Sequence, residues 1–477
     1  MMSVRRKALT AGVAAGVAAL VVVPVSIALA APSSTIDVGD SPVGVVVSQD
    51  GQYAVVASSD GQRLDVVDLA TRVVDRTVAL PNRATDLVAH PEADRYLVAS
   101  FTGSEVYDID LSTDPASIAT IDLLWAPDQV DVTPSGDRAV LANRATDEIA
   151  ILDLDVGTVE RYVDSGVDNP SPVIVIDDAT AWAGAEGSAE RVRIALATGA
   201  TEIVATGIDD NSAFTLDPDG VHAWTAHGIT GDLTQWRLSD GAVTETVLLA
   251  SGQLTSVAAN PVVPLLYVAD FGGDVLVLDR STASYLDPID AAGPYRVAVS
   301  DDGATLLVVL LTGDVLLVFD LVVMAEPVAP LQGVEGEPFS FSTVVIDVDG
   351  MSASITDGAL PQGLVLDPST GVVSGEPEEF GTFSATITVT GSGDGQPRTL
   401  ELDIEVEPAD DVNPLPSASP SITPSPSPSG PAPDLGGDGA ENDLAATGAA
   451  PVLPLLALGG MAVALGLVVT RLVRVRE

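Results

Sequence analysis

The sequence contains no cysteine, so neither a disulfide framework nor thiolate chemistry is available to this protein. Lysine is almost absent too: Lys7 is the only one, and the other basic residues are arginines. Aromatic residues make up only 4% of the chain. The formal net charge is -48, and phosphate binding requires a basic face that such a composition does not supply. We therefore expect no nucleic-acid partner.

Sequence signatures of catalysis are also missing. There is no GxSxG nucleophile turn, no Walker phosphate loop and no dinucleotide-binding glycine fingerprint. Of the three histidines, His90 and His222 fall at a turn and a strand start, and we expect both to be structural or solvated. His227 falls between a second and a third strand, where a site is plausible, but nothing pairs with it at metal-ligand spacing. We predict no catalytic residue and no bound metal from these patterns.

The first 30 residues have the layout of a secretory signal peptide. The basic residues Arg5, Arg6 and Lys7 precede an apolar run over 8–29, and small residues precede an expected cleavage site near Ala30. The remainder of the chain is then exported. The length of the apolar run leaves open an uncleaved N-terminal anchor.

Residues 44–80 contain a unit that the chain repeats about every 42 residues. The unit reads as four short strands, expected at 44–48, 53–58, 63–69 and 75–80, separated by turn pairs such as Asp50-Gly51. A single sheet of this kind cannot bury both of its faces, whereas copies stacked radially can. Seven copies predict an all-β fold with a seven-bladed β-propeller over 31–324. The seventh copy lacks its fourth strand, and we expect 35–39 (TIDVG) to supply it and close the ring.

The segments SPVGVVVSQDGQYAVVASS and LDVVDLATRVV resemble the YVTN-type repeats of extracytoplasmic propellers. No second strand ends in Tyr-Val-Thr-Asn, and only 141–143 approaches that ending. The resemblance implies a propeller and an extracytoplasmic location. It does not imply one activity, because propellers host binding, scaffolding and enzymatic roles.

A second domain is expected over 325–408, where strands alternate without a helical period. Residues 360–390 (LPQGLVLDPSTGVVSGEPEEFGTFSATITVT) resemble the immunoglobulin-like (Ig-like) domains of bacterial surface proteins, which implies a small β-sandwich. Related modules of the cadherin type bind Ca²⁺, and Asp347 and Asp349 are the candidate ligands here. An isolated DVDG is also an ordinary solvated turn, and apart from Ca²⁺ we expect no cofactor.

The C-terminal part has the order of a surface anchor. A Pro/Ser-rich linker over 409–443 is expected to be an extended spacer, and a transmembrane helix is predicted over 449–470, before a basic cytoplasmic tail over 471–477. The pentapeptide before the helix, with this order, resembles the LAxTG variant of the sortase sorting signal in Gram-positive bacteria. The resemblance implies recognition by sortase, cleavage between Thr447 and Gly448, and attachment to peptidoglycan in the cell wall. An ordinary membrane anchor is the alternative. The pentapeptide consists of Leu444, Ala445, Ala446, Thr447 and Gly448.

In a propeller, the connections between blades and the loops between second and third strands converge on one face around the central channel. In this chain those loops collect a set of side chains enriched in the aromatic and arginine types that dominate binding hot spots. Three arginines among them predict a local positive focus for an anionic ligand. We call this set the converging face; it consists of Arg83, Phe101, Trp125, Arg144, His227, Phe271, Tyr295 and Arg296.

These patterns together predict a secreted, cell-wall-anchored protein whose propeller binds a surface ligand or protein that the sequence does not name. Two alternatives remain open from the sequence. One is a lactonase-like hydrolase on a propeller scaffold, which rests on fold analogy. The other is a structural spacer.

Overall fold

The computed structural model describes residues 25–26, 32–92, 94–249, 252–321, 323–325, 330–346, 351–390 and 397–409. All regular structure in these ranges is β-strand, which confirms the all-β prediction. The predicted linker beyond Ala409, the sorting motif, the helix and the tail lie outside the described residues, as do Asp347 and Asp349. No helix long and apolar enough to cross a membrane occurs in the ranges given above.

The first repeat folds as its sequence predicts. Strand β4 is buried along almost its whole length, while the outermost strand β6 alternates between exposed and half-buried residues. This contrast follows from position, because an inner strand is covered on both faces and an outer strand on one. The turn between β3 and β4 uses Gly51 at φ +70°, a conformation that favours glycine. The sheet consists of β3 (Pro42–Val47), β4 (Tyr53–Ser58), β5 (Arg63–Asp68) and β6 (Val73–Ala79).

Five further sheets repeat this four-stranded antiparallel order. The second sheet consists of β7 (Ala84–Ala89), β8 (Arg95–Ser100), β9 (Glu105–Asp110) and β10 (Ser117–Asp122). The third consists of β11 (Gln129–Val132), β12 (Arg138–Asn143), β13 (Glu148–Asp153) and β14 (Thr158–Asp164). The fourth consists of β15 (Pro170–Asp177), β16 (Thr180–Ala185), β17 (Glu190–Ala195) and β18 (Ala200–Ala205). The fifth and sixth consist of β19 (Asn211–Leu216), β20 (His222–His227), β21 (Asp232–Arg237) and β22 (Val243–Leu248), and of β23 (Leu254–Ala259), β24 (Leu265–Asp270), β25 (Val275–Asp279) and β26 (Ser284–Ile289).

The seventh sheet combines the two ends of the repeat region. Its own strands are β27 (Pro294–Val299), β28 (Thr305–Leu310) and β29 (Val315–Asp320), and its fourth strand is the N-terminal β2 (Ser34–Asp37). Strand β2 pairs antiparallel with β29, from Ser34 opposite Val318 to Asp37 opposite Val315. The predicted closure by the N-terminal strand is therefore confirmed.

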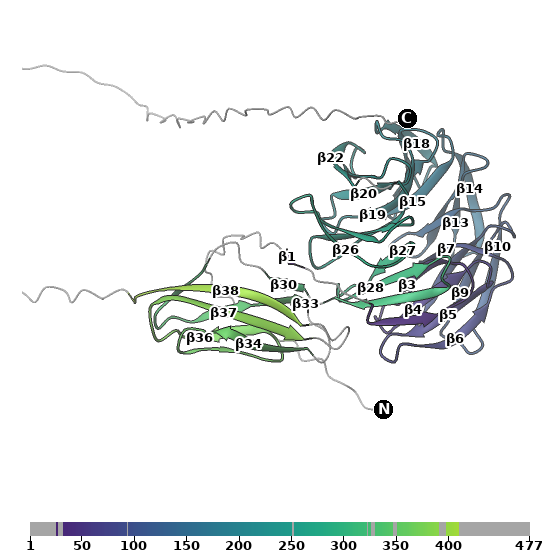
Figure 1. Ribbon diagram of the computed structural model, residues 1–477. Coiled ribbons are helices and arrows are strands. Elements are labelled where there is room, and N and C mark those ends of the chain that lie inside the picture. Colours follow the sequence, from purple (N-terminus) through teal and green to yellow (C-terminus); the bar gives the residue numbers. More distant parts are fainter. Residues whose placement is uncertain are drawn as a thin grey trace, which may run out of the picture. The chain divides into compact units, whose positions relative to one another are not determined.

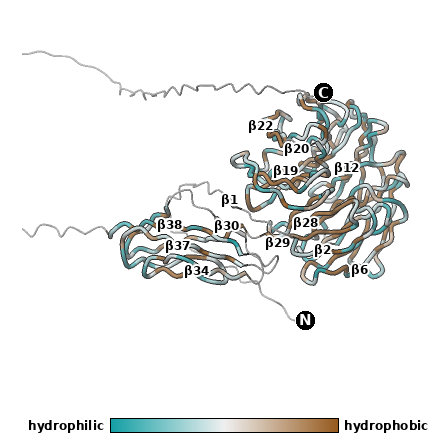
Figure 2. The backbone as a smooth tube through the Cα atoms, in the orientation of Figure 1, coloured by the Kyte–Doolittle hydropathy of each residue, from teal (hydrophilic) through white to brown (hydrophobic). Residues whose placement is uncertain are grey.

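The seven sheets form a closed ring with a propeller-like fold (Figure 1). Each innermost strand contacts the next in the order β3, β7, β11, β15, β19, β23 and β27, and β27 contacts β3. Hydrophobic clusters join neighbouring sheets; one contains Leu64 of the first sheet together with Tyr96 of the second. In Figure 2 the strands of the ring are mostly brown, the colour of hydrophobic residues, and teal hydrophilic residues are concentrated in the loops. The core is thus divided among the spaces between adjacent sheets.

The residues after the ring form a two-sheet sandwich. Val389 and Ile404 are among the buried side chains of its core, to which Met324 also belongs. A further small sheet joins β1 (Val25–Ser26), β30 (Val323–Ala325) and β33 (Val344–Ile346), and β1 is the only described part of the predicted signal peptide. The sandwich sheets consist of β31 (Leu331–Val334), β38 (Arg398–Glu407), β37 (Gly381–Thr390) and β34 (Ser352–Gly358), and of β32 (Phe339–Ser342), β36 (Val372–Gly375) and β35 (Leu364–Leu366).

Candidate binding site

Five of the eight residues predicted for the converging face line one pocket of about 170 Å³, which we call the mouth pocket. They reach it from loops and strand ends that are far apart in the sequence: Arg83 precedes β7, Phe101 follows β8, Arg144 follows β12, and the other two lie at the start of β27. The repeat makes this possible, because equivalent loops of different sheets converge around one axis. The charged and aromatic side chains that line the mouth pocket are Arg83, Phe101, Asp128, Arg144, Tyr295 and Arg296.

Two aromatic rings lie side by side at the edge of the mouth pocket. The rings of Tyr295 and Phe271 meet edge to face with centroids 6.2 Å apart. The guanidinium carbon of Arg296 lies 5.0 Å from the centroid of the Tyr295 ring, a cation–π arrangement. Phe101 is 61% exposed, so its ring is available to a ligand. The structure therefore brings Phe271 next to the five pocket residues, although it does not line the pocket.

Trp125 does not belong to this surface. It lies in the connection between β10 and β11, as the sequence analysis expected, but its side chain is buried among the second and third sheets. Its ring packs edge to face against Tyr162, with centroids 5.7 Å apart. The prediction of Trp125 as a binding residue is wrong, because its large indole is buried between two sheets and away from solvent.

His227 is also buried, and the prediction that it lies in an accessible loop is wrong. It is the last residue of β20 and has no exposed surface. Its Nδ1 lies 3.0 Å from the carbonyl oxygen of Asp209, and its Nε2 lies 2.9 Å from Oγ1 of Thr234. Burial lowers the pKa of His227 to about 4, so the imidazole is neutral at physiological pH. Its role is structural.

The arginines of the mouth pocket do not form the positive focus that the sequence analysis expected. Arg83 forms an ion pair with Asp60. Nε of Arg144 lies 2.8 Å from Asp128 Oδ2, and its Nη2 lies 2.8 Å from Glu186 Oε1. These carboxylates neutralise two of the three guanidinium groups. Burial nevertheless raises the pKa of Glu186 to about 7, even with Arg144 beside it.

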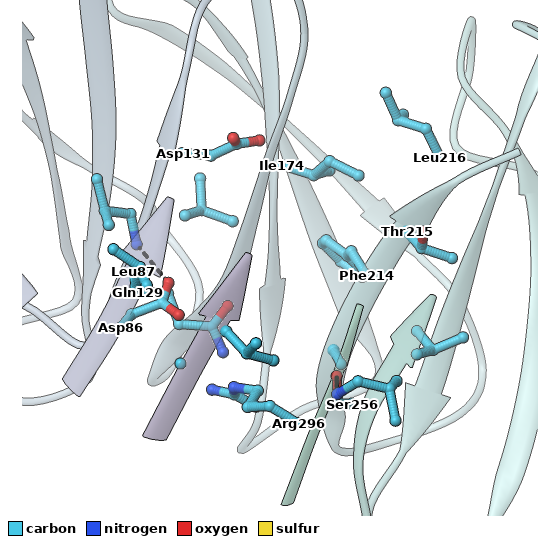
Figure 3. Close-up of a pocket in the computed structure, with 17 residues that line it drawn as sticks. Asp86, Leu87, Gln129, Asp131, Ile174, Phe214, Thr215, Leu216, Ser256 and Arg296 are labelled. Carbon is cyan, nitrogen blue, oxygen red and sulfur yellow. Dashed lines mark hydrogen bonds between the residues drawn. The ribbon is translucent and has the colours of Figure 1, made fainter. Parts of the chain in front are cut away.

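Below the mouth pocket lies the channel cavity, a space of about 420 Å³ to which all seven innermost strands contribute. Arg296 lines both spaces, so the two adjoin at this residue. In the view of Figure 3, Asp86, Gln129 and Arg296 lie on one side of the cavity, and Phe214 and Thr215 lie on the other. The polar residues that line the cavity are Asp86, Gln129, Asp131, Thr215, Ser256 and Arg296.

Two carboxylates of the channel cavity have strongly altered acidity. Burial raises the pKa of Asp86 to about 6, against the opposing charge of Arg296. Burial also raises the pKa of Asp131 to about 6, although the backbone N–H groups of Val175 and Val132 donate to it at 2.7 and 2.8 Å. Neither residue was predicted from the sequence. The available signal was a carboxylate within an otherwise uncharged innermost strand, as in ATDLVA and QVDV.

The acidic side chains of the ring do not gather as metal ligands. Across the part of the chain that the structure describes, no group of three or more His, Cys, Asp or Glu side chains is arranged to hold a metal ion. The calcium ligands suggested by the sequence, Asp347 and Asp349, lie outside the described residues.

Comparison with known proteins supports the two-part fold. Residues 322–405 match the family model described as "Putative Ig domain". This segment is an Ig-like domain. No curated protein matches the chain. Among solved structures, a chain of Kuenenia stuttgartiensis hydrazine synthase matches with a TM-score of 0.53 and 18% sequence identity, over 59% of this chain and 96% of that one. At this identity the similarity concerns the fold alone.

Proposed function

We propose that the ring is a seven-bladed β-propeller that binds a ligand at the mouth pocket and the channel cavity. The observation that supports this most strongly is the convergence of Arg83, Phe101, Arg144, Tyr295 and Arg296 on one pocket next to a polar cavity. A cavity with a few convergent polar groups and altered pKa values is the usual character of a binding site. Exposed aromatic rings beside it provide contact area at little entropic cost.

We further propose that the protein displays this propeller on the outside of a Gram-positive cell. The Ig-like domain and the Pro/Ser-rich linker act as the stalk, and the LAATG motif directs sortase to join the chain to peptidoglycan. The support is the order of the sequence features: signal peptide, ring, Ig-like domain, linker, pentapeptide, apolar segment and basic tail.

The binding function is tested by identifying what copurifies with the full-length protein by native mass spectrometry. The triple variant Arg83→Gln/Phe101→Ala/Arg296→Gln removes two charges and one ring from the mouth pocket. We expect a species bound to the unaltered protein to be absent from this variant. Unaltered copurification in the mouth variant contradicts the proposal.

A matched control removes the same types of group elsewhere on the ring. Arg193, Arg237 and Tyr285 have substantially exposed side chains and do not line the mouth pocket or the channel cavity. The variant Arg193→Gln/Tyr285→Ala/Arg237→Gln is expected to keep the copurifying species. Loss in both triple variants indicates a general surface effect and also contradicts the proposal.

A further inference from the structure

The charged groups of the channel cavity keep unused hydrogen-bonding capacity. Oδ2 of Asp86 accepts a 3.1 Å hydrogen bond from the N–H of Val130. Nη1 of Arg296 donates a 2.6 Å hydrogen bond to the carbonyl oxygen of Thr255, while its Nε and Nη2 donate to no acceptor among the described residues. Asp86 and Arg296 form no ion pair with each other or with any other described residue. The carboxylate of Asp86 and the guanidinium of Arg296 line the same cavity without pairing, so both keep hydrogen-bonding positions that a ligand between them can fill.

The repeat explains why these two groups remain apart. Arg296, Gly44 and Asp86 occupy the same position of the consecutive innermost strands β27, β3 and β7, each directly after the bulge in its strand pairing. Gly44 therefore lies between the guanidinium and the carboxylate and contributes no side chain. A Cβ at position 44 would lie 2.8 Å from Cβ of Leu87, so close packing of the strands requires glycine there. The opening between the two charges is thus a consequence of the backbone.

Asp131 adds a second acceptor to the cavity. It lies one strand further round the ring, on β11, and the charge of Asp86 contributes to the raised pKa of Asp131, which indicates that the two carboxyls act on each other. The channel cavity therefore holds two carboxyls without a cation paired to them and one guanidinium with two free donor groups. Around the mouth, Arg83 and Arg144 are already neutralised by acids. A purely anionic ligand therefore meets one unpaired cation, Arg296, and is repelled by the carboxylates of the cavity.

We propose that the channel cavity binds a small ligand that carries both an ammonium group and a carboxylate, the chemical class of free amino acids. The ammonium group lies at Asp86, and the carboxylate accepts from Nε and Nη2 of Arg296. This inference rests on the proposed function, because the ligand enters through the mouth pocket. The cavity volume of about 420 Å³ lies within the range of small-molecule sites.

Isothermal titration of the full-length protein with alanine, alaninamide and N-acetylalanine tests the inference. Alaninamide lacks the carboxylate, and N-acetylalanine lacks the ammonium group. We expect alanine to bind, and each blocked analogue to bind roughly ten- to a hundredfold more weakly, the effect of one lost charged hydrogen bond. Equal affinity for all three compounds overturns the proposal.

Two variants assign each charge to one residue. Arg296→Gln should abolish the preference for alanine over alaninamide, and Asp86→Asn should abolish the preference over N-acetylalanine. Two control variants remove charges of the same sign outside the cavity. Glu202→Gln, on the outer strand β18, is the control for Asp86→Asn, and Arg193→Gln, at an exposed position, is the control for Arg296→Gln. Both controls should keep both preferences. Preferences that persist in Arg296→Gln and Asp86→Asn overturn the assignment of the site.

Failure of the ligand-class inference can be distinguished from failure of the proposed binding function. If a species copurifies in a mouth-dependent manner and alanine does not bind, the inference about ligand class fails while the binding function stands. If no species copurifies in a mouth-dependent manner and alanine does not bind, both fail.

Discussion

The backbone N–H of Gly39 donates a 2.7 Å hydrogen bond to Oδ2 of Asp65. Gly39 follows the closing strand β2, whereas Asp65 lies in β5 of the first sheet and is fully buried. The same carboxylate accepts from Nε of Arg63 at 3.0 Å and from the hydroxyl of Thr77 at 2.8 Å. A Cβ at position 39 would lie 2.6 Å from Cβ of Ser58, so the close approach depends on glycine. Asp65 thus ties the strand that closes the ring to the sheet that begins it.

Replacement of Asp65 by alanine should destabilise the whole ring. The change leaves the Gly39 N–H without its acceptor in a buried position, at a cost of about 2–3 kcal/mol in the free energy of unfolding. Urea unfolding followed by tryptophan fluorescence measures this, because Trp182, Trp224 and Trp236 are fully buried in the distant fourth and fifth sheets. The exposed Asp122→Ala is the control and should change little. If the urea midpoint of the fluorescence change is the same in Asp65→Ala as in the unaltered protein, the contact between Gly39 and Asp65 does not stabilise the ring as a whole.

A buried guanidinium makes a second stability prediction. Arg191 has no exposed surface, and Nη2 donates to the hydroxyls of Thr225 and Thr234 at 3.1 and 3.0 Å. Its Nε and Nη1 have no partner in the described structure, and its Cζ lies 4.7 Å from the centroid of the Trp236 ring. Burial lowers the pKa of Arg191 to about 9. We expect Arg191→Met to raise the free energy of unfolding by about 1–4 kcal/mol, because it removes a desolvated charge while it keeps the volume.

The control for this variant is Arg193→Met on the same strand, whose side chain is 40% exposed. It should leave the free energy of unfolding nearly unchanged. A loss of stability in Arg191→Met would mean that the cation–π contact and the two threonine hydrogen bonds outweigh the cost of desolvation.

The channel carboxyls predict how stability depends on pH. Asp86 and Asp131 have pKa values of about 6 in the folded protein, against an ordinary value of 3.8. The folded state therefore binds more protons between these values, so each group's favourable contribution is complete below about pH 4 and is lost as the pH rises to about 6. Asp86→Asn should equal the unaltered protein in stability near pH 4 and exceed it by about 3 kcal/mol at pH 7.

His227 contributes with the opposite sign. Its folded pKa of about 4 lies below the ordinary value of 6.5, so stability is lost as the pH falls between these values. Thermal unfolding of Asp86→Asn and His227→Gln across pH 4–8, each compared with the unaltered protein, separates the two effects. Parallel curves for Asp86→Asn and the unaltered protein would show that the Asp86 carboxyl is not desolvated.

The proposed anchor predicts a change in how the protein is released from cells. Sortase transfer proceeds through the carbonyl of Thr447, so Thr447→Ala should remain in the membrane and be extracted by detergent. The unaltered protein should require digestion of the wall. The control is Ala446→Ser, which changes only the variable third position of the LAxTG pattern and should still be anchored in the wall. Detergent extraction of all three forms to the same extent identifies a simple membrane anchor.

The strands were predictable because each repeat has β-branched residues between turn pairs, and the sequence boundaries of the first sheet differ from the structure by one or two residues. Closure was predictable because the seventh repeat lacked a strand and 35–39 matched it. Five residues of the mouth pocket were predictable, because the repeat fixes which face each loop occupies. Repetition therefore determines both architecture and the placement of loops.

The direction of individual side chains could not be predicted in the same way. Trp125 lies in a converging loop, but its orientation depends on Tyr162, which belongs to another sheet. The neutralisation of Arg144 depends on Asp128 and Glu186, which lie in the connection before β11 and in a loop of the fourth sheet. Such contacts between sheets are not encoded in the local pattern. Charge balance at the mouth is therefore a tertiary property.

Site-specific photo-crosslinking on intact cells tests the binding account most directly. Phe101 is 61% exposed at the mouth pocket, whereas Tyr285 is 49% exposed on the outer strand β26, so a photoreactive phenylalanine derivative at each position makes a matched pair. We predict that irradiation gives a discrete adduct at position 101, that Arg296→Gln abolishes it, and that position 285 gives none. Adducts of equal yield at both positions, or an adduct at 101 that is insensitive to Arg296→Gln, would contradict a binding site at the mouth of the channel.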